Sequence, residues 1–238
     1  MALAKKQLIT VKEKETMAEL TVPHNGRKLT FLHLAYGPNT YANVAQAIEQ
    51  EGLHQPTMAE ITSLVYAALN SGDRYSQEIR DKMRDNWIWG FVGELDVLRE
   101  GVYIEDRPAI RNGFIFMDKN DLEERLKKGD PRVRFIRPGF KTESMTPMEI
   151  ADNSYLVALV GAEGTEKIAQ IADKQKRNKT SLWNFKSENQ TTARVLAFSS
   201  NWLMNIPKSY VFGYDVSGGR QGLAYAIKRP GENNHAKQ

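Results

Sequence analysis

The chain has 238 residues, of which 41% are hydrophobic, and this content is enough for one substantial core. No window approaches the ~18 unbroken apolar residues that a membrane span needs. No apolar run follows the charged N-terminus, so we expect synthesis in the cytoplasm, with no secretory signal and no membrane insertion. The absence of cysteine excludes disulfides, thiolate metal sites and cysteine nucleophiles. The net charge of +4 is mild, which argues against nucleic acid as a partner.

The first 35 residues alternate between apolar and polar blocks. Apolar side chains gather at residues 8–11, 20–22 and 29–34, and charged or turn-forming residues separate them. The dipeptide Asn25-Gly26 is a strong signal for a tight hairpin turn. We therefore predict short strands joined by hairpins.

Two amphipathic helices are expected next. Thr40 is a candidate cap for the first helix, and Gly52 stands where a helix-ending glycine belongs. The second helix opens with Thr57 and Glu60, whose spacing is that of a capping box. Each helix presents one apolar face, so both are predicted to pack on a sheet or on each other.

The middle of the chain alternates between charged and apolar segments. Residues 73–86 are polar and predicted to be helical, and 87–92, which contain Trp87 and Trp89, are predicted to form a buried strand. Helix starts are expected near 121 and at Thr146, where Pro147 takes the first helical position and Glu149 completes a capping box with Thr146. Further strands are predicted at 102–104, 113–117, 133–136 and 155–160, and a helix at 166–176.

The C-terminal part has three strand-like pieces, at residues 194–198, 210–214 and 222–227. Polar and glycine-rich connections, 199–209 and 215–221, separate them. We therefore predict a small sheet whose strands are joined by exposed loops.

The chain shows little sign of catalytic chemistry. Its four histidines lack metal-ligand spacing, and no serine lies in a Gly-x-Ser-x-Gly elbow. The segment 161–164, between a predicted strand and helix, lacks the lysine and serine of a phosphate-binding loop. The acidic residues between 118 and 124 do not match a calcium-loop spacing. The expectation is a protein that is not an enzyme, with no metal and no cofactor.

Three segments, in order, resemble a known pattern. They are residues 52–64, with Pro56-Thr57 before Glu60; 198–202, Phe-Ser-Ser-Asn-Trp; and 211–229, a loop followed by a strand that ends in Arg229. Together they resemble C-type-lectin-like domains of the formylglycine-generating-enzyme type. The likeness is greatest to the variable proteins of diversity-generating retroelements. The resemblance implies an α+β, C-type-lectin-like fold with short mixed or antiparallel sheets, two helices in the N-terminal half and variable loops near the C-terminus.

The resemblance also implies a domain plan and a function. Residues 1–238 would form one C-type-lectin-like domain, with 90–190 as an elaborating insertion and 194–229 as the variable ligand-binding region. The partner would be a macromolecule, either a protein or a surface structure, as expected for a viral or mobile-element protein. Ligand-binding positions would be Asn201, Leu203, Asn205, Ile206, Lys208, Phe212, Asp215, Val216, Gly219 and Arg220. Scaffold positions would be Trp202, Met204, Tyr210, Gly213 and Tyr214.

The residues themselves agree with a binding role. Apolar side chains such as Phe212, Ile206 and Val216 in loops would form an exposed patch rimmed by polar groups, which is typical of interaction sites. Tyrosines such as Tyr210 and Tyr214 are favoured at recognition surfaces. Two alternatives stay open: a structural component of a virus-like or cell-surface particle, and an enzyme built on the same fold.

Overall fold

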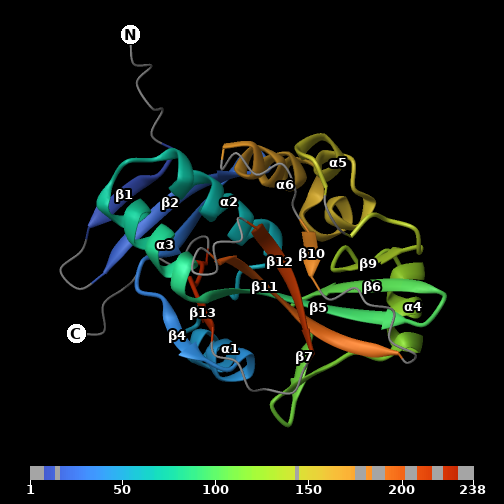
Figure 1. The fold of residues 1–238 in the computed structure, drawn as a ribbon. Helices are drawn as coiled ribbons and strands as arrows, with labels where there is room; N and C mark the ends of the chain where they lie inside the picture. The colour runs from blue at the N-terminus through green and yellow to red at the C-terminus, as the bar shows by residue number, and fades with distance from the viewer. Residues whose placement is uncertain are drawn as a thin grey trace.

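The fold is mixed α+β (Figure 1). The computed structural model describes residues 8–13, 17–142, 145–174, 181–183, 191–201, 208–215 and 222–229. An N-terminal antiparallel sheet contains β1 (Thr10–Glu13), β2 (Ala18–His24) and β3 (Arg27–Leu32). Asn25 and Gly26 both adopt positive φ angles in the β2–β3 turn, which confirms the predicted hairpin.

The main sheet is built around β5 (Trp87–Val97). One edge of β5 pairs with β11 (Thr192–Asn201), which pairs in turn with β12 (Lys208–Asp215) and then β10 (Ser181–Trp183). The other edge pairs first with β13 (Gly222–Ala224) and then with β6 (Gly101–Asp106). The outer strands are β4 (Tyr36–Asn39), beside β13, and β9 (Val133–Ile136), beside β6. A separate hairpin contains β7 (Ala109–Arg111) and β8 (Phe114–Phe116).

The helices begin where the sequence places their caps. Side chains of Thr40, Thr57 and Thr146 accept hydrogen bonds from the first turns of their helices, and the last two complete capping boxes. The elements are α1 (Tyr41–Gln50), α2 (Met58–Asn70), α3 (Arg74–Asp85), α4 (Lys119–Lys127), α5 (Pro147–Ala151) and α6 (Ser154–Lys174). Across the described residues, none of these helices has the length and apolar character of a membrane span.

The prediction of a strand at 155–160 is wrong, because these residues form the first part of α6. Tyr155, Leu156, Leu159 and Val160 are buried, which is the one-sided spacing of a helix, whereas Val157 is exposed. The backbone leaves helical geometry only at Gly161, with φ of 75°. The expected strand-to-helix turn at 161–164 is therefore a break between two helical segments, and the segment offers no anion-binding loop.

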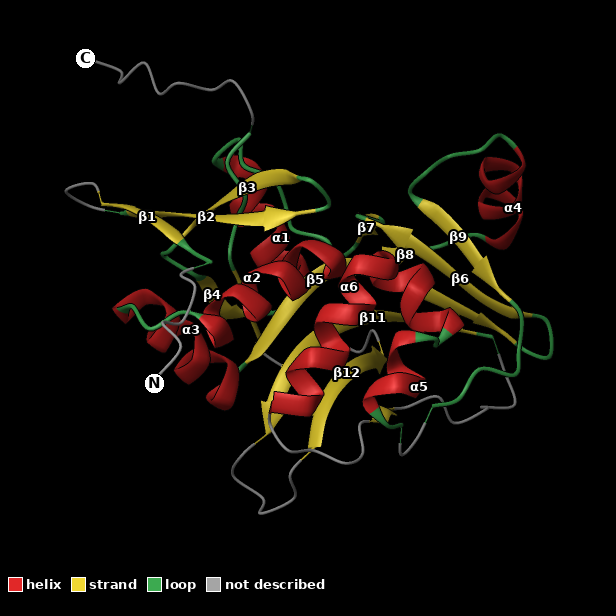
Figure 2. Ribbon diagram, turned by 90° about the horizontal axis from the view of Figure 1, so that it is seen from above, coloured by secondary structure: helices red, strands yellow, loops and turns green. Residues whose placement is uncertain are grey.

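The two faces of the main sheet are covered by different elements (Figure 2). Helices α2, α3 and α6, together with the N-terminal sheet, cover one face, and α1 with the β7–β8 hairpin covers the other. Strand β5 alternates accordingly: Ile88 and Val92 belong to the first core, and Trp89 and Phe91 to the second. This burial of Trp89 confirms its predicted core role.

Gly90 of β5 lies close against the first residue of α2. A Cβ atom at this position would lie 2.9 Å from the Cα atom of Met58, which is backbone and has no rotamer to change. We therefore expect Gly90→Ala to lower the free energy of unfolding by about 2–3 kcal/mol. Gly72, where an added Cβ meets nothing within 4 Å, is the matched control. Urea unfolding of both variants measures the difference, and equal stabilities would contradict the close approach.

Candidate functional site

The structure describes seven of the fifteen positions that the sequence assigned to the binding region. Asn201 ends β11, and Lys208, Phe212 and Asp215 lie in β12 with the three scaffold positions Tyr210, Gly213 and Tyr214. The other eight lie outside the described residues: Trp202, Leu203, Met204, Asn205, Ile206, Val216, Gly219 and Arg220.

The expectation that these residues occupy loops needs correction for Asn201, Lys208 and Asp215, whereas Phe212 lies within the predicted strand 210–214. Asn201 and Lys208 are register partners in the last pair of the β11–β12 ladder, and Phe212 is the partner of Ala197. Asp215 is paired with Arg194 at the other end of the same ladder. The strands are longer than the apolar runs because backbone pairing continues through polar residues as long as a neighbouring strand is present. The candidate region is therefore partly sheet.

Strand β11 fixes this region to the core. Its residues alternate between the two faces, with Leu196 and Phe198 in one apolar cluster and Val195 and Ala197 in the other. All four are buried. Together they remove several hundred Å² of apolar surface from water, which at roughly 25 cal/mol per Å² is a large contribution for one strand. β11 is thus a strand held firmly in the core, and β12 pairs with it.

The strand that follows the candidate region also returns directly to the core. Residues 223–227 are all buried. Ile227 exchanges two backbone hydrogen bonds with His54, at 2.8 and 2.9 Å, in the segment that precedes α2. Phe198 is the register partner of Val211. Of the three segments that carry the resemblance, 211–229 therefore contacts both of the others. It is hydrogen-bonded to 52–64 through Ile227 and His54, and it pairs with 198–202 through Val211 and Phe198.

A buried charge network stands at the end of the sheet where β12 finishes. Glu94 of β5 and Arg194 of β11 are register partners, both essentially inaccessible, with Oε1 and Nη1 3.6 Å apart. The hydroxyl of Tyr155, from α6, donates a 2.7 Å hydrogen bond to Glu94 Oε2. Asp96 Oδ2 lies 3.8 Å from the same Nη1 of Arg194. Four residues from three elements are thereby tied together.

The environment of Glu94 favours its neutral form. Burial raises the pKa of Glu94 to about 7, although Tyr155 and Arg194 act in the opposite direction. Perturbed carboxyl groups of this kind occur at functional sites and also in structural networks. Neither Glu94 nor Arg194 was predicted as a site residue. Glu94 follows the apolar run 87–92, and Arg194 begins the strand-like run 194–198, so each stands at the border of a predicted strand.

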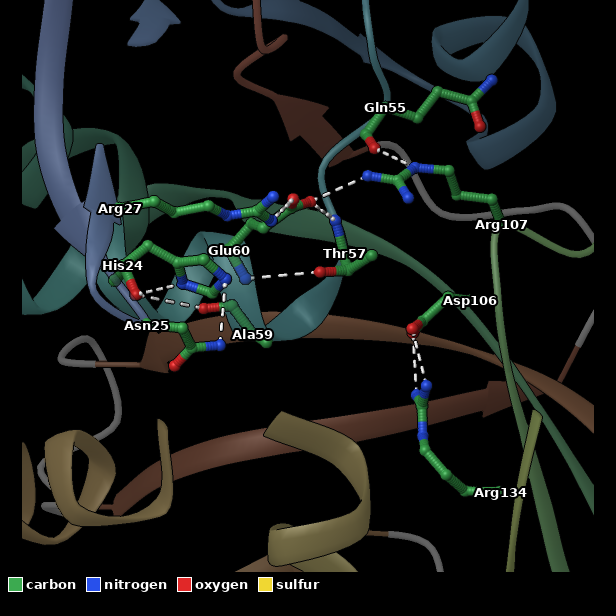
Figure 3. Close-up of polar contacts among 11 residues, drawn as sticks. His24, Asn25, Arg27, Gln55, Thr57, Ala59, Glu60, Asp106, Arg107 and Arg134 are labelled. Atoms are coloured by element: carbon green, nitrogen blue, oxygen red, sulfur yellow. Dashed lines mark hydrogen bonds and ion pairs between the residues drawn. The ribbon is translucent and has the colours of Figure 1, made fainter. Parts of the chain in front are cut away.

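A second polar centre surrounds Glu60 at the start of α2 (Figure 3). Its Oε2 accepts hydrogen bonds from the Thr57 amide at 2.8 Å and from Arg107 at 2.9 Å, and Arg27 lies 3.6 Å from Oε1. Arg107 also donates to the carbonyl of Gln55 at 2.6 Å. Glu60 therefore joins the start of β3 to the segment after β6, and both of its carboxylate oxygens contact an arginine.

Ser63 lies in an arrangement that superficially suggests a nucleophile. Its Oγ is 2.9 Å from Nδ1 of His24 and 2.8 Å from Nζ of Lys167. However, Lys167 also donates to the carboxylate of Glu163 and, at 3.4 Å, to the carbonyl of Pro23. The Ser63 hydroxyl also donates to the carbonyl of Ala59 at 3.3 Å, and Ser63, His24 and Lys167 are all buried, so a substrate has no access to the hydroxyl. We interpret this cluster as structural support between β2, α2 and α6.

The same cluster predicts how stability depends on pH. Burial lowers the pKa of His24 in the folded protein, so the unfolded chain takes up a proton first as the pH falls. The contribution of neutral His24 to stability is therefore present above pH 6.5 and is lost progressively below it. We expect the stability gap between the parent and His24→Gln to shrink from pH 7.5 to pH 5.5 in urea unfolding. A constant gap would show that His24 does not titrate differently on folding.

No cluster of three or more His, Cys, Asp or Glu side chains suited to a metal ion occurs among the residues that the structure describes. In the comparisons with known proteins, no protein-family model, no curated protein and no solved structure matches this chain.

Proposed function

We propose that this protein is a binding protein that recognises a protein or surface target, without catalysis, through residues 199–221 on a C-type-lectin-like scaffold. The observation that carries the proposal is the burial on both sides of this region. Val195–Phe198 before it and residues 223–227 after it are buried in the two apolar clusters. Core residues on both sides anchor the scaffold, so we propose that the scaffold does not depend on the side chains between them, which can then serve recognition.

The contacts between distant segments support the C-type-lectin-like assignment. The segment before α2 is hydrogen-bonded to Ile227, and β11 is paired with β12, so the residues that carry the resemblance form one connected unit. Three helices, α1, α2 and α3, follow β4, one more than the two that the resemblance implies, and β4 pairs with β13. Strand β4, from the N-terminal half, is thereby paired with β13 near the C-terminus. Of the proposed insertion 90–190, residues 90–97 lie in the central strand β5, and the described residues after them lie between β5 and β11 in the chain.

The nucleotide sequence of the gene and its neighbourhood tests the proposal. In a diversity-generating system, the codons for residues 199–221 would differ from a near-identical neighbouring repeat only at adenines, and a reverse-transcriptase gene would lie nearby. Sequencing this locus in many isolates is expected to show substitutions concentrated in those codons, with codons 192–198 and 222–229 as the internal control. Uniform substitution across the three blocks, with no such repeat, would contradict the proposal and favour a structural component of a particle.

A further inference from the structure

A cavity of about 360 Å³ lies at the turn between β5 and β6, outside residues 199–221. This volume is at the lower end of the range for small-molecule sites, roughly 300–1,000 Å³. Its apolar walls include Val97 and Val102, both buried, and Phe140. Phe140 is stacked on Tyr155, with ring centroids 5.1 Å apart, so this wall is held by the buried network of Glu94 and Arg194.

Two opposite charges line the same cavity. Asp96 is the carboxylate of the buried network that reaches the cavity, and a quarter of its side chain is exposed. Arg99, three residues later in the turn, is exposed and forms no ion pair with any residue in the described ranges. Its φ of 64° lies in the left-handed region, where glycine or asparagine would be less costly. An arginine in this strained position, beside a cavity, is a candidate for function.

The presence of both charges beside one cavity restricts the kind of ligand that it can bind. A simple cation would meet Arg99, and a simple anion would meet Asp96, so neither suits the cavity alone. A molecule with an ammonium and a carboxylate group on one carbon, and an apolar body, matches all three surfaces. We propose that this cavity binds a free α-amino acid with an aromatic or aliphatic side chain, its ammonium on Asp96, its carboxylate on Arg99 and its side chain against Phe140.

The test is an NMR titration of the isotope-labelled full chain with three probes. L-phenylalanine carries both charges, 2-phenylethylamine lacks the carboxylate, and 3-phenylpropionate lacks the ammonium. We expect saturable shifts at the amides of residues 97–101 and 139–140, with phenylalanine binding about tenfold or more tightly than either analogue. Absence of saturable shifts up to ~10 mM of every probe, or equal affinity for all three, would overturn the proposal.

Variants separate the two charge contacts. Asp96→Asn is expected to reduce the affinity for phenylalanine to that for 3-phenylpropionate, and Arg99→Gln to that for 2-phenylethylamine. Arg99→Glu should bind 2-phenylethylamine more tightly than the other two probes. Misfolding cannot produce such a gain in affinity. Arg84→Gln and Asp85→Asn remove an exposed ion pair at the end of α3 and serve as matched controls. If affinity is unchanged in Asp96→Asn and Arg99→Gln, or falls equally in the controls, the assignment is wrong.

Discussion

Replacing Arg194 by methionine is expected to lower the free energy of unfolding by about 3–5 kcal/mol at pH 8. Arg194 is essentially inaccessible, and its guanidinium is the counter-charge for Glu94 and Asp96. Removing it leaves a carboxylate in a low-dielectric site without compensation, which is the costly way to break a buried ion pair. Urea unfolding at fixed ionic strength measures the loss.

Two further measurements test whether the loss in Arg194→Met comes from the charge of Glu94. At pH 5.5 the loss should be smaller, because a neutral Glu94 needs no counter-charge. The double variant Arg194→Met, Glu94→Leu should recover part of the stability, since an apolar pair of similar volume replaces the ions. Arg84→Met, at an exposed ion pair, is the control and should change stability by no more than about 0.5 kcal/mol. A loss in Arg194→Met no larger than in this control would show that the buried pair contributes nothing.

Replacing Glu94 by glutamine should stabilise the protein relative to the parent as the pH rises. The pKa of Glu94 is 4.5 in the unfolded chain and about 7 in the folded protein, so the folded state holds its proton more tightly. The favourable contribution of protonated Glu94 is therefore complete below pH 4.5 and is lost as the pH rises to 7. Glutamine keeps an acceptor for Tyr155 and has no proton to lose, so the difference should grow by about 3 kcal/mol between pH 4.5 and 8.

The measurement is a series of urea unfolding curves of both proteins across this pH range. Asp85→Asn, which removes the charge of an exposed carboxylate, is the control for the substitution itself. A stability difference between the parent and Glu94→Gln that does not change with pH would contradict the raised pKa. It would show instead that Arg194 holds Glu94 ionised throughout.

Local signals in the sequence predicted much of the secondary structure. Capping residues such as Thr57 and Thr146, and the Asn25-Gly26 turn, act through contacts within a few residues, so they can be recognised without the fold. The error at 155–160 arose because a short apolar run does not distinguish a buried strand from a buried helix. The short strands β4 and β10 were missed because their pairing depends on partners distant in the sequence. Strand β7 pairs with its neighbour β8, and it was missed because a strand of three residues is too short to give a recognisable pattern.

The buried polar centres could not be predicted for the same reason. Glu94 and Arg194 are 100 positions apart and meet only through the register of β5 and β11. Ser63 and Lys167 likewise meet only after α2 and α6 pack together. The binding region was predicted from a resemblance and from loop composition, whereas strand pairing places Asn201, Lys208 and Asp215 in the sheet, beyond the predicted strand limits.

The most direct test of the proposed binding role is a pair of displayed libraries, scored by resistance to protease and then selected on an unrelated protein target. The first library randomises Leu203, Ile206, Val216 and Arg220. The second randomises the buried residues Val195, Leu196, Leu223 and Tyr225. We predict that most members of the first library are as resistant to protease as the parent and that some bind the target specifically. Few members of the second library should be resistant to protease. If the first library unfolds as often as the second, the four positions belong to the core and the proposed binding role is wrong.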